Sequence, residues 1–367
     1  MTGRMADAPT VTIAADRLTR FAAEIFTAAG CDAEEAAGIG HYLVSANLAG
    51  HDSHGVIRTR RYVLWLREGY VRAGQRPSIV SETPTHALVD GNFGFGQTIA
   101  PLAVDLGIAK ARDAGIAVIA LRNTGHIGRI GDWGERAAAA GMVSLHFVNV
   151  AMGELVAPYG GVDRRFSTNP VCICAPQPEG PPLLLDMATS LVAEGKVLVA
   201  SNGGKPIPAD ALIEPDGHLS GDPRTLYGPI EGTHVRDPAN GPGALRTFGE
   251  HKGSALAFMC EILAGCFTGN GTSGPIPGGR RARISNGMLS IYLRPDAFGA
   301  AHFAEAAREY AGYVKASRPA LPEGEVLVPG EPEARTRAAR LRDGVPLQAD
   351  TWAALVTTAE ELGVALP

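Results

Sequence analysis

The middle of the chain alternates short apolar runs with glycine-rich turns, whereas both ends carry the periodicity of amphipathic helices. The runs at 115–121, 143–150 and 288–293 are rich in Val, Ile and Leu and have the length of buried strands. Apolar side chains between residues 18 and 29 recur instead at the i, i+3, i+4, i+7 spacing of one helix face. Helices at both ends around strands in the middle predict an α/β fold, with the chain ends packed together as one helical domain.

The same patterns predict the individual elements. Strands are expected at 87–89, 115–121, 143–150, 170–175, 182–186 and 288–293. Helices are expected at 18–29, 33–49, 57–68, 98–114, 130–140, 190–201, 254–267, 300–316, 333–342 and 350–362. Asp32 followed by Glu35 resembles a capping box. The Gly-, Pro- and Asp-rich stretch at about 202–247 is expected to form long surface loops with little core.

Composition excludes several classes of protein. A chain of 367 residues suggests about two domains, and 45% hydrophobic with 19% charged residues argues for an ordered globular protein. The net charge of -5 and the lack of a long basic run argue against a nucleic-acid partner. No apolar run reaches the roughly 18 residues of a membrane span, and the first ten residues contain no signal-peptide core. A membrane partner is therefore not expected.

The five cysteines are expected to be reduced thiols. Their number is odd and no Cys-x-x-Cys pair occurs, so neither a disulfide framework nor a metal site is predicted. Thiols of this kind are typical of cytoplasmic proteins.

The glycines at 91, 94 and 96 form a G-x-x-G-x-G cluster before a predicted helix. The dinucleotide fingerprint is G-x-G-x-x-G, and no acidic residue follows at the required distance. We interpret the cluster as a turn into the helix, so a Rossmann site is not expected.

Two histidine motifs carry the clearest chemistry. His54 lies in AGHDSHGVIRTRRY, four residues before Arg58, and His126 lies in NTGHIGRIGDWGE directly after a predicted strand. Imidazole exchanges protons near neutral pH, and a guanidinium holds a carboxylate by a two-pronged bond. This pairing suits a 2-oxo or 2-hydroxy acid. The alternatives are arginines that face solvent at a helix start and a loop histidine with a structural role.

Two further segments suggest an anion or nucleotide site. Asp186 ends an apolar run, where a carboxylate can accept hydrogen bonds from ribose hydroxyls, and Thr189 or Ser190 could cap the next helix. His251 and Lys252 precede a long apolar helix, whose start can bind an anion. A plain helix cap and a solvated lysine are the alternatives.

Taken in order, these segments resemble the type-2 malate/L-lactate dehydrogenase family, also called the L-sulfolactate dehydrogenase-like family, and are close to its hydroxycarboxylate dehydrogenase B subgroup. The resemblance covers about residues 16 to 362. The matching blocks are ANLAGHDSHG (46–55), GHIGRIGDW (125–133), RFSTNPVC (165–172), LLLDMATS (183–190), GEHKGSALAFMCEILAG (249–265) and LVPGE (327–331).

The resemblance implies a non-Rossmann α/β fold. A mixed, largely antiparallel sheet would bind NAD or NADP beside a helical domain built from both chain ends. Residues 10–82 with 295–367 would form the helical domain, and residues 83–294 the NAD(P)-binding domain with the insertion at 202–247. Family members usually form homodimers with the site near the subunit boundary.

The resemblance also implies roles for individual residues. His54 and His126 fall on histidines assigned to proton transfer in different members, and Arg58 falls on an arginine that would hold the substrate carboxylate. Many members have Tyr-Gly where this chain has Ser254 and Ala255, which affects the packing of that helix start. The implied cofactor contacts are Gly128, Arg129, Ile130, Leu184, Leu185, Asp186, Met187, Ala188, His251, Lys252, Asn286, Gly330, Glu331, Pro332 and Glu333.

We therefore predict a cytoplasmic, NAD(P)-dependent oxidoreductase that transfers a hydride between the cofactor and a small-molecule 2-oxo acid. The alternatives within the family are a ureidoglycolate dehydrogenase and a cyclic imine-2-carboxylate reductase. An alternative outside it is a ligand-binding protein without turnover.

Overall fold

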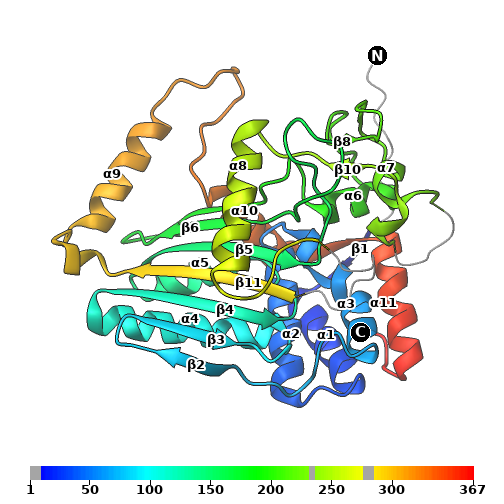
Figure 1. The fold of residues 1–367 in the computed structure, drawn as a ribbon, viewed down its shortest axis with the longest axis horizontal. Coiled ribbons are helices and arrows are strands. Elements are labelled where there is room, and N and C mark those ends of the chain that lie inside the picture. Colours follow the sequence, from blue (N-terminus) through cyan, green and yellow to red (C-terminus); the bar gives the residue numbers. More distant parts are fainter. Residues whose placement is uncertain (1–9, 231–235, 276–284) are drawn as a thin grey trace.

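The computed structural model describes residues 10–230, 236–275 and 285–367. A seven-stranded sheet occupies its centre, in the order β2-β3-β4-β11-β5-β6-β7 (Figure 1). Only β3 and β4 run parallel, whereas every other pair of neighbours is antiparallel. The expected mixed, largely antiparallel sheet is confirmed. Its strands are β2 (Ser78–Glu82), β3 (His86–Asp90), β4 (Ile116–Thr124), β5 (Val143–Ala151), β6 (Val171–Ala175), β7 (Leu183–Met187) and β11 (Ser285–Leu293).

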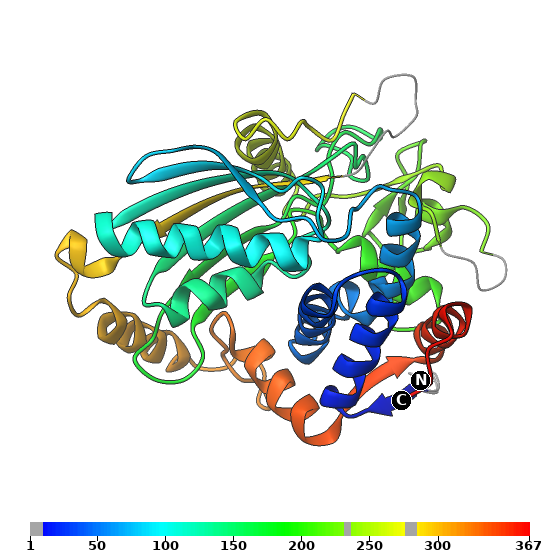
Figure 2. The same ribbon diagram turned by 90° about the horizontal axis from the view of Figure 1, so that it is seen from below.

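Two helices cover one face of this sheet. Figure 2 shows α4 (Gly96–Ala114) and α5 (Gly131–Ala139) lying along the strands. Their apolar faces meet the central strands in a core that includes Trp133 and Tyr292, both fully buried. Because β11 pairs antiparallel with β4 on one side and with β5 on the other, the start of β11 and the ends of β4 and β5 lie together at one end of the sheet.

A second core joins the two ends of the chain. It packs α1 (Ala15–Ala28), α2 (Ala33–Leu48) and α3 (Thr59–Arg67) against α11 (Ala349–Leu362). The helix face predicted from residue 18 onward supplies much of this core, and Asp32 caps α2 by accepting a hydrogen bond from the Glu35 amide. The reciprocal half of the capping box does not form, because the Glu35 carboxylate accepts from the Gly74 amide instead.

Outside residues 202–247, three strands of the part that the structure describes were not expected. β1 (Thr10–Ile13) pairs with β12 (Val345–Gln348), and β2 extends the central sheet from within the segment 10–82 that the sequence assigned to helices. β1 and β12 have four residues each, too few for a clear periodicity, and their pairing partners lie far apart in the sequence. The pairing therefore depends on tertiary contacts rather than on local pattern.

The expectation that residues 202–247 lack a core is wrong for the part that the structure describes. A small antiparallel sheet forms from β8 (Leu212–Ile213), β9 (Leu219–Ser220) and β10 (Ala244–Leu245), with α7 (Arg224–Tyr227) beside it. Its apolar residues pack with those of α6 (Glu194–Ser201) into a third core. The residues concerned are too widely spaced among Gly and Pro for a periodic signal. The short 3-10 helix η3 (Pro238–Asn240) precedes β10.

The start of α6 differs from the expected one. The helix begins at Glu194 rather than near Ser190, and its N-cap, Ala193, makes no side-chain cap. Thr189 and Ser190 do not cap it, since their hydroxyls donate to the carbonyls of Thr168 and Val192.

The remaining helices lie in the second half of the chain. α8 (His251–Cys260) continues as a π-helix, η4 (Glu261–Cys266), and starts earlier than expected, so His251 and Lys252 are its first two residues. Gly249 and Glu250 have positive φ angles of 53° and 61°, a backbone conformation that cannot continue the helix, so α8 begins at His251. The others are η6 (Pro295–Phe298), α9 (Phe303–Lys315) and α10 (Glu331–Asp343). No helix of the described part has the length and hydropathy to span a membrane.

All five cysteines are free thiols. Cys31, Cys172, Cys174 and Cys260 are buried, whereas Cys266 is exposed.

Candidate active site

A cavity of about 400 Å³ lies where the three cores meet. The end of the central sheet contributes His126 and Asn286, the helical region contributes His54 and Arg58, and the third core contributes Glu194. All three residues predicted to be catalytic therefore line one cavity, although they are up to 72 positions apart in the sequence.

The two histidines lie next to each other in the lining of this cavity. Their rings are stacked, with 5.5 Å between the centroids and 12° between the planes. His54 ends the 3-10 helix η1 (Asp52–His54), and its Nδ1 lies 3.0 Å from the Ser53 hydroxyl. His126 follows β4, and its Nδ1 lies 2.5 Å from the hydroxyl of Tyr62.

Burial keeps both imidazoles neutral. It lowers the pKa of His126 to about 3, with a further contribution from the charge of Arg58. Burial, followed by the charges of His126 and Arg58, lowers the pKa of His54 well below its usual value. Two charged rings at this distance would repel each other, so the pair can carry at most one extra proton at neutral pH.

The glycine cluster supports the loop that carries His126. A Cβ on Gly96 would lie 2.4 Å from the His126 carbonyl oxygen, and the Gly125 amide donates to the Gly94 carbonyl at 2.8 Å. Only a residue without a side chain permits this approach at position 96. The cluster is thus the turn into α4 that the sequence predicted, and it also positions the histidine loop.

Arg58 is held by an acidic partner. It is the last residue of the 3-10 helix η2 (Val56–Arg58), its Nη2 donates to Glu194 at 2.8 Å, and its Nε donates to the Ser53 carbonyl at 2.7 Å. Glu194 also accepts from the hydroxyl of Tyr227 at 2.5 Å. Burial alone would raise the pKa of Glu194, but the charge of Arg58 and the hydrogen bonds from Tyr227 and Arg58 together outweigh burial and lower it. The pair is therefore ionised on both sides.

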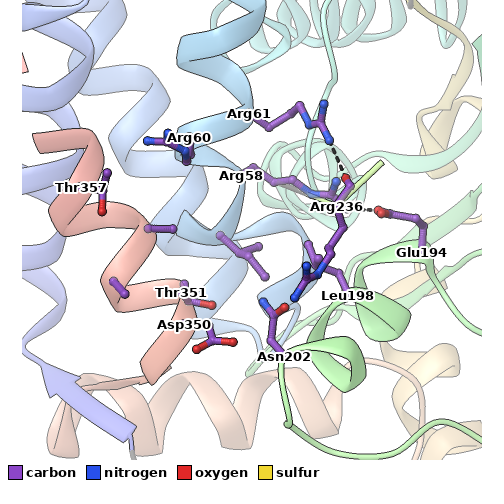
Figure 3. A pocket seen from close by; sticks show the side chains of 13 residues that line it. Arg58, Arg60, Arg61, Glu194, Leu198, Asn202, Arg236, Asp350, Thr351 and Thr357 are labelled. Atoms are coloured by element: carbon purple, nitrogen blue, oxygen red, sulfur yellow. Dashed lines mark hydrogen bonds and ion pairs between the residues drawn. The ribbon is translucent and has the colours of Figure 1, made fainter. Parts of the chain in front are cut away.

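A second cavity of about 370 Å³ adjoins this ion pair on its other side (Figure 3). Arg60 and Arg61 line it together with Arg58. Their guanidinium groups are engaged: Arg60 pairs with Glu361 at 3.1 Å, and Arg61 donates to the Arg236 carbonyl at 2.6 Å.

The residues predicted to bind the cofactor include a network of charges around Asp186. The Asp186 carboxylate accepts from the Gly131 amide at 2.8 Å and lies 3.6 Å from Arg129 and 3.9 Å from His51. His51 in turn lies 3.4 Å from Glu333. These contacts bring the strand β7, the loop after His126 and the start of α10 together.

These residues differ in exposure. Leu185 to Ala188, Glu331 to Glu333, and the pair His251 and Lys252 are at least partly exposed, whereas Gly128, Arg129, Ile130, Leu184, Asn286 and Gly330 are buried. Arg129 is enclosed by Asp132, Glu135 and Asp186, whose charges raise its pKa against the effect of burial. The Arg129 side chain therefore forms ion pairs inside the protein and is not open to a ligand. Gly330, at a φ of 95°, would place a Cβ 2.6 Å from the Pro182 carbonyl oxygen.

Asn286 links the sheet to the histidine loop. Its Oδ1 accepts from the Ile127 amide at 3.0 Å, and its Nδ2 donates to the Asn149 carbonyl at 2.8 Å. Both polar atoms of the Asn286 side-chain amide are hydrogen-bonded to the backbone, which supports a positioning role for this residue beside the cavity.

The start of α8 lies against the end of β7. The Phe248 amide donates to the Thr189 carbonyl at 3.1 Å, and a Cβ on Gly253 would lie 2.9 Å from the same oxygen. His251 and Lys252 are therefore near the exposed residues that follow Asp186, although they are far from it in the sequence.

Sequence reasoning missed three side chains at this site. Tyr62 and Gln97 form a hydrogen-bonded chain to His126, and Glu194 holds Arg58. Tyr62 follows Arg58 by one helical turn, a spacing that could have suggested it. No sequence signal marks Gln97 or Glu194, because each reaches the site only through the packing of α4 or α6.

The mixed, largely antiparallel sheet defines an α/β protein that lacks the parallel sheet of a Rossmann fold. A model of the malate/L-lactate dehydrogenase family matches residues 13–356, and the chain belongs to this family.

Two relatives and one solved structure show the extent of the similarity. The chain is 41% identical over 352 residues to hydroxycarboxylate dehydrogenase B of Escherichia coli O157:H7, covering 95% of this chain and 94% of that protein. It is 34% identical over 326 residues to a Δ1-pyrroline-2-carboxylate/Δ1-piperideine-2-carboxylate reductase of Pseudomonas putida, covering 88% and 89%. The structure of malate dehydrogenase from Pyrococcus horikoshii OT3 matches with a TM-score of 0.84 at 28% identity, covering 98% and 99%.

Proposed function

We propose that the protein transfers a hydride reversibly between NAD(P)H and C2 of a 2-oxo acid, giving a 2-hydroxy acid. The observation that carries the proposal is the meeting of two stacked histidines and an arginine in one cavity. The similarity to hydroxycarboxylate, malate and lactate dehydrogenases supports the substrate class.

Each side chain has a role in this proposal. Arg58 bonds the C1 carboxylate of the substrate and orients C2, for which its planar fork is suited. An imidazole N–H of His54 or His126 faces the C2 oxygen. The negative charge that develops on this oxygen raises the proton affinity of the nearby imidazole. The imidazole takes up a proton from solvent, passes it to the oxygen and is neutral again afterwards. In the oxidising direction a neutral imidazole accepts the hydroxyl proton.

The exposed residues around β7 and α8 fit a dinucleotide. The Asp186 carboxylate is only 7% exposed, is fixed by the Gly131 amide and is suited to accept from ribose hydroxyls. Lys252 and His251 are exposed at the start of a ten-residue helix, where cations and backbone N–H groups favour phosphate. When bound, the nicotinamide supplies the hydride.

We propose that cofactor contacts come mainly from Leu185 to Ala188, His251, Lys252 and the stretch Glu331 to Glu333. The buried residues of the predicted set, Gly128 to Ile130, Leu184, Asn286 and Gly330, shape the floor of the site rather than present side chains to it. Arg129 in this view holds Asp186 and its neighbours.

A cyclic imine-2-carboxylate is a second candidate substrate. The 34% identity to a pyrroline-2-carboxylate reductase favours it. Such a substrate keeps the carboxylate that Arg58 would hold and replaces the C2 oxygen by nitrogen.

Three further features belong to the proposal. The protein is a cytoplasmic homodimer with two domains, residues 10–82 with 295–367 and residues 83–294. The strand β2 at the end of the first segment joins the central sheet and so belongs with the second domain. Large exposed apolar side chains on the outer face of α8 and η4, and on α9, support a subunit interface. They are Phe258, Met259, Phe267, Tyr310 and Tyr313.

A steady-state assay tests the proposal. Absorbance of NADH and of NADPH is followed with a panel of 2-oxo acids, their neutral amides and Δ1-pyrroline-2-carboxylate. Turnover of one or more 2-oxo acids supports the proposal, and the preferred coenzyme identifies NAD or NADP use. Turnover of the imine alone would favour the second candidate. Cofactor binding without any turnover would favour a ligand-binding protein.

A further inference from the structure

Tyr62 and Gln97 form a buried hydrogen-bonded chain that ends on His126. Gln97 Nε2 lies 3.1 Å from the Tyr62 hydroxyl, which lies 2.5 Å from Nδ1 of His126. Tyr62 is 2% exposed and Gln97 is 1% exposed. The three side chains come from α3, α4 and the loop after β4. The series of hydrogen bonds between them therefore exists only in the folded protein.

Packing fixes the position of the tyrosine hydroxyl. The Tyr62 ring contacts Phe26, Phe95 and Trp65, with centroid separations of 6.4, 6.2 and 5.8 Å. A ring held on three sides cannot swing its hydroxyl away from His126. Burial also raises the pKa of Tyr62 to about 12, so the hydroxyl keeps its proton at neutral pH.

The direction of the two hydrogen bonds follows from which atoms of the buried Gln97 amide have partners. In the orientation observed, Nε2 donates to Tyr62, and Oε1 has no hydrogen-bond partner within the described residues. The reversed amide would leave a buried NH₂ group in place of that oxygen. Orphaned buried donors are rarer than under-satisfied carbonyl oxygens. Because Gln97 donates to the tyrosine oxygen, the tyrosine hydrogen is left to bond Nδ1 of His126.

We propose that Tyr62 is a positioning residue that holds His126 as the tautomer with its proton on Nε2. Since Nδ1 accepts from Tyr62, a neutral ring must carry its hydrogen on Nε2, on the opposite edge. His126 lines the cavity, so this N–H serves as a hydrogen-bond donor to the C2 oxygen of the substrate. The inference rests on the proposed function and deepens it.

The two histidines then have different tasks. His126, fixed by Tyr62, stabilises the developing negative charge as a neutral donor, an arrangement known in other enzymes. Among the residues that the structure describes, the His54 ring is hydrogen-bonded only to the Ser53 hydroxyl, which can turn to donate or accept. His54 is therefore free to change its protonation state, and it is the residue that exchanges a proton with the substrate oxygen.

The tautomer is measured directly by NMR of the full-length protein labelled with ¹⁵N-histidine. We expect the His126 signals, assigned by their loss in His126→Gln, to show a protonated Nε2 and an unprotonated Nδ1 at neutral pH. A protonated Nδ1 in the unmodified protein would overturn the proposal. This measurement needs neither turnover nor a folded Tyr62 variant, so it separates failure of this inference from failure of the proposed function.

Kinetics of Tyr62→Phe test the consequence. Phenylalanine keeps the ring contacts and removes only the hydroxyl. We expect kcat for the 2-oxo acid to fall roughly 10- to 10²-fold while the Kd of NADH stays within twofold. The matched control is Tyr292→Phe, a buried tyrosine that does not line the cavity, for which kcat is expected to be unchanged.

A double variant distinguishes positioning from simple packing. In His126→Gln, the glutamine NH₂ group offers a hydrogen-bond donor near the former position of Nε2. An amide has no alternative tautomer, so Tyr62 has none to select in this variant. In this background Tyr62→Phe is expected to have no further effect on kcat. An equal fall in both backgrounds, or an unchanged kcat in Tyr62→Phe alone, would mean that Tyr62 does not act through His126.

Discussion

Arg58 and Glu194 neutralise each other beside the stacked histidines. The guanidinium that would hold the substrate carboxylate therefore already has a carboxylate partner at 2.8 Å, and substrate must share it. The sequence pointed to Arg58 through its distance from His54, but the competing charge comes from α6, 136 residues further on. Binding of a carboxylate thus depends on a pair rather than on a single residue.

Replacing Arg58 by alanine is expected to reduce kcat/KM selectively for carboxylate substrates. The cost should be about 2–5 kcal/mol of transition-state binding, since the substrate carboxylate would lie unpaired beside the buried charge of Glu194. Arg58→Lys should recover only part, because an ammonium lacks the planar fork. The measurement compares a 2-oxo acid with its neutral amide. Equal losses on both substrates would assign the carboxylate to another group, and Glu194→Gln, the matched variant, should not lose the acid selectively.

Removing either imidazole is expected to lower kcat by roughly 10²–10⁴ while cofactor binding survives. The variants are His54→Asn and His126→Asn, and His41→Asn, which does not line the cavity, is the control. NADH fluorescence titration reports binding, and initial rates report kcat. Near-normal rates in both active-site variants would remove acid–base catalysis from these residues.

The pH profile of the oxidising reaction should follow the lowered histidine pKa values. This direction needs a neutral imidazole, and burial lowers the pKa of His54 and of His126 below 6.5. The activity is therefore expected to be flat near neutral pH and to fall only on the acidic side of pH 6.5. An acidic limb centred above pH 6.5 in kcat/KM for the 2-hydroxy acid would contradict this.

At the scale of elements, the close packing of the helix α4 on the central sheet helps to position the site. The helix α4 packs so tightly on β11 that a Cβ on Gly107 would lie 2.2 Å from the Tyr292 ring. The glycine turn before α4 supports the His126 loop, so the packing of this helix and the position of the catalytic loop are connected.

Gly107→Ala is expected to destabilise the protein by about 1–3 kcal/mol, because the buried Tyr292 ring must move. Gly312 in α9 is a matched helical glycine with open space around its Cβ position. Gly312→Ala is expected to stabilise by up to about 1 kcal/mol through helix propensity. Urea unfolding of both variants gives the two free energies of unfolding. A neutral result for Gly107→Ala would show that α4 can shift on the sheet.

Lys252→Ala should weaken NADH binding several-fold and leave the KM of the oxo acid nearly unchanged. Lys252 is exposed at the start of α8, where a cation and free helix amides suit a phosphate. Fluorescence titration measures the Kd, and Lys205→Ala, another exposed lysine outside the predicted site, is the control. An unchanged Kd would remove Lys252 from the cofactor site.

At the scale of the whole molecule, three cores surround one polar cavity and keep several histidines from solvent. His146 is fully buried in the central sheet between the hydroxyls of Ser144 and Ser290, at 3.0 and 2.8 Å. Burial lowers its pKa to about 3. The folded protein therefore keeps His146 neutral under conditions in which an unfolded chain would bind a proton.

The protein is expected to lose stability as the pH falls below about 6.5. Between about pH 6.5 and 3 the unfolded state binds the extra proton of His146 and the folded state does not, so this residue costs about 1.4 kcal/mol per pH unit. Urea unfolding from pH 7 to 5 should show a smaller slope for His146→Gln than for the unmodified protein. The exposed His302→Gln is the control, and equal slopes in all three proteins would refute the assignment.

Much of the architecture was predictable from local pattern. The central strands and the amphipathic face that begins at residue 18 follow from hydrophobic periodicity, because an element that buries one face must repeat apolar residues at its own period. The short strands β1, β2 and β12 and the core within residues 202–247 were not predicted. β1 and β12 pair with each other from the two ends of the chain, and the core within residues 202–247 forms against other segments such as α6. β2 pairs with the neighbouring β3, but all its residues are exposed, so it has no apolar period.

The sequence by itself determined which chemical groups the protein offers: two histidines in glycine-flanked loops, an arginine one turn after the first, and a carboxylate at a strand end. The family blocks around them identified the kind of chemistry. Only the tertiary structure decided how these groups meet. It stacked the two imidazoles, paired Arg58 with Glu194, and connected Tyr62 and Gln97 to His126, since charge, tautomer and burial depend on neighbours that the folded chain brings from separate elements.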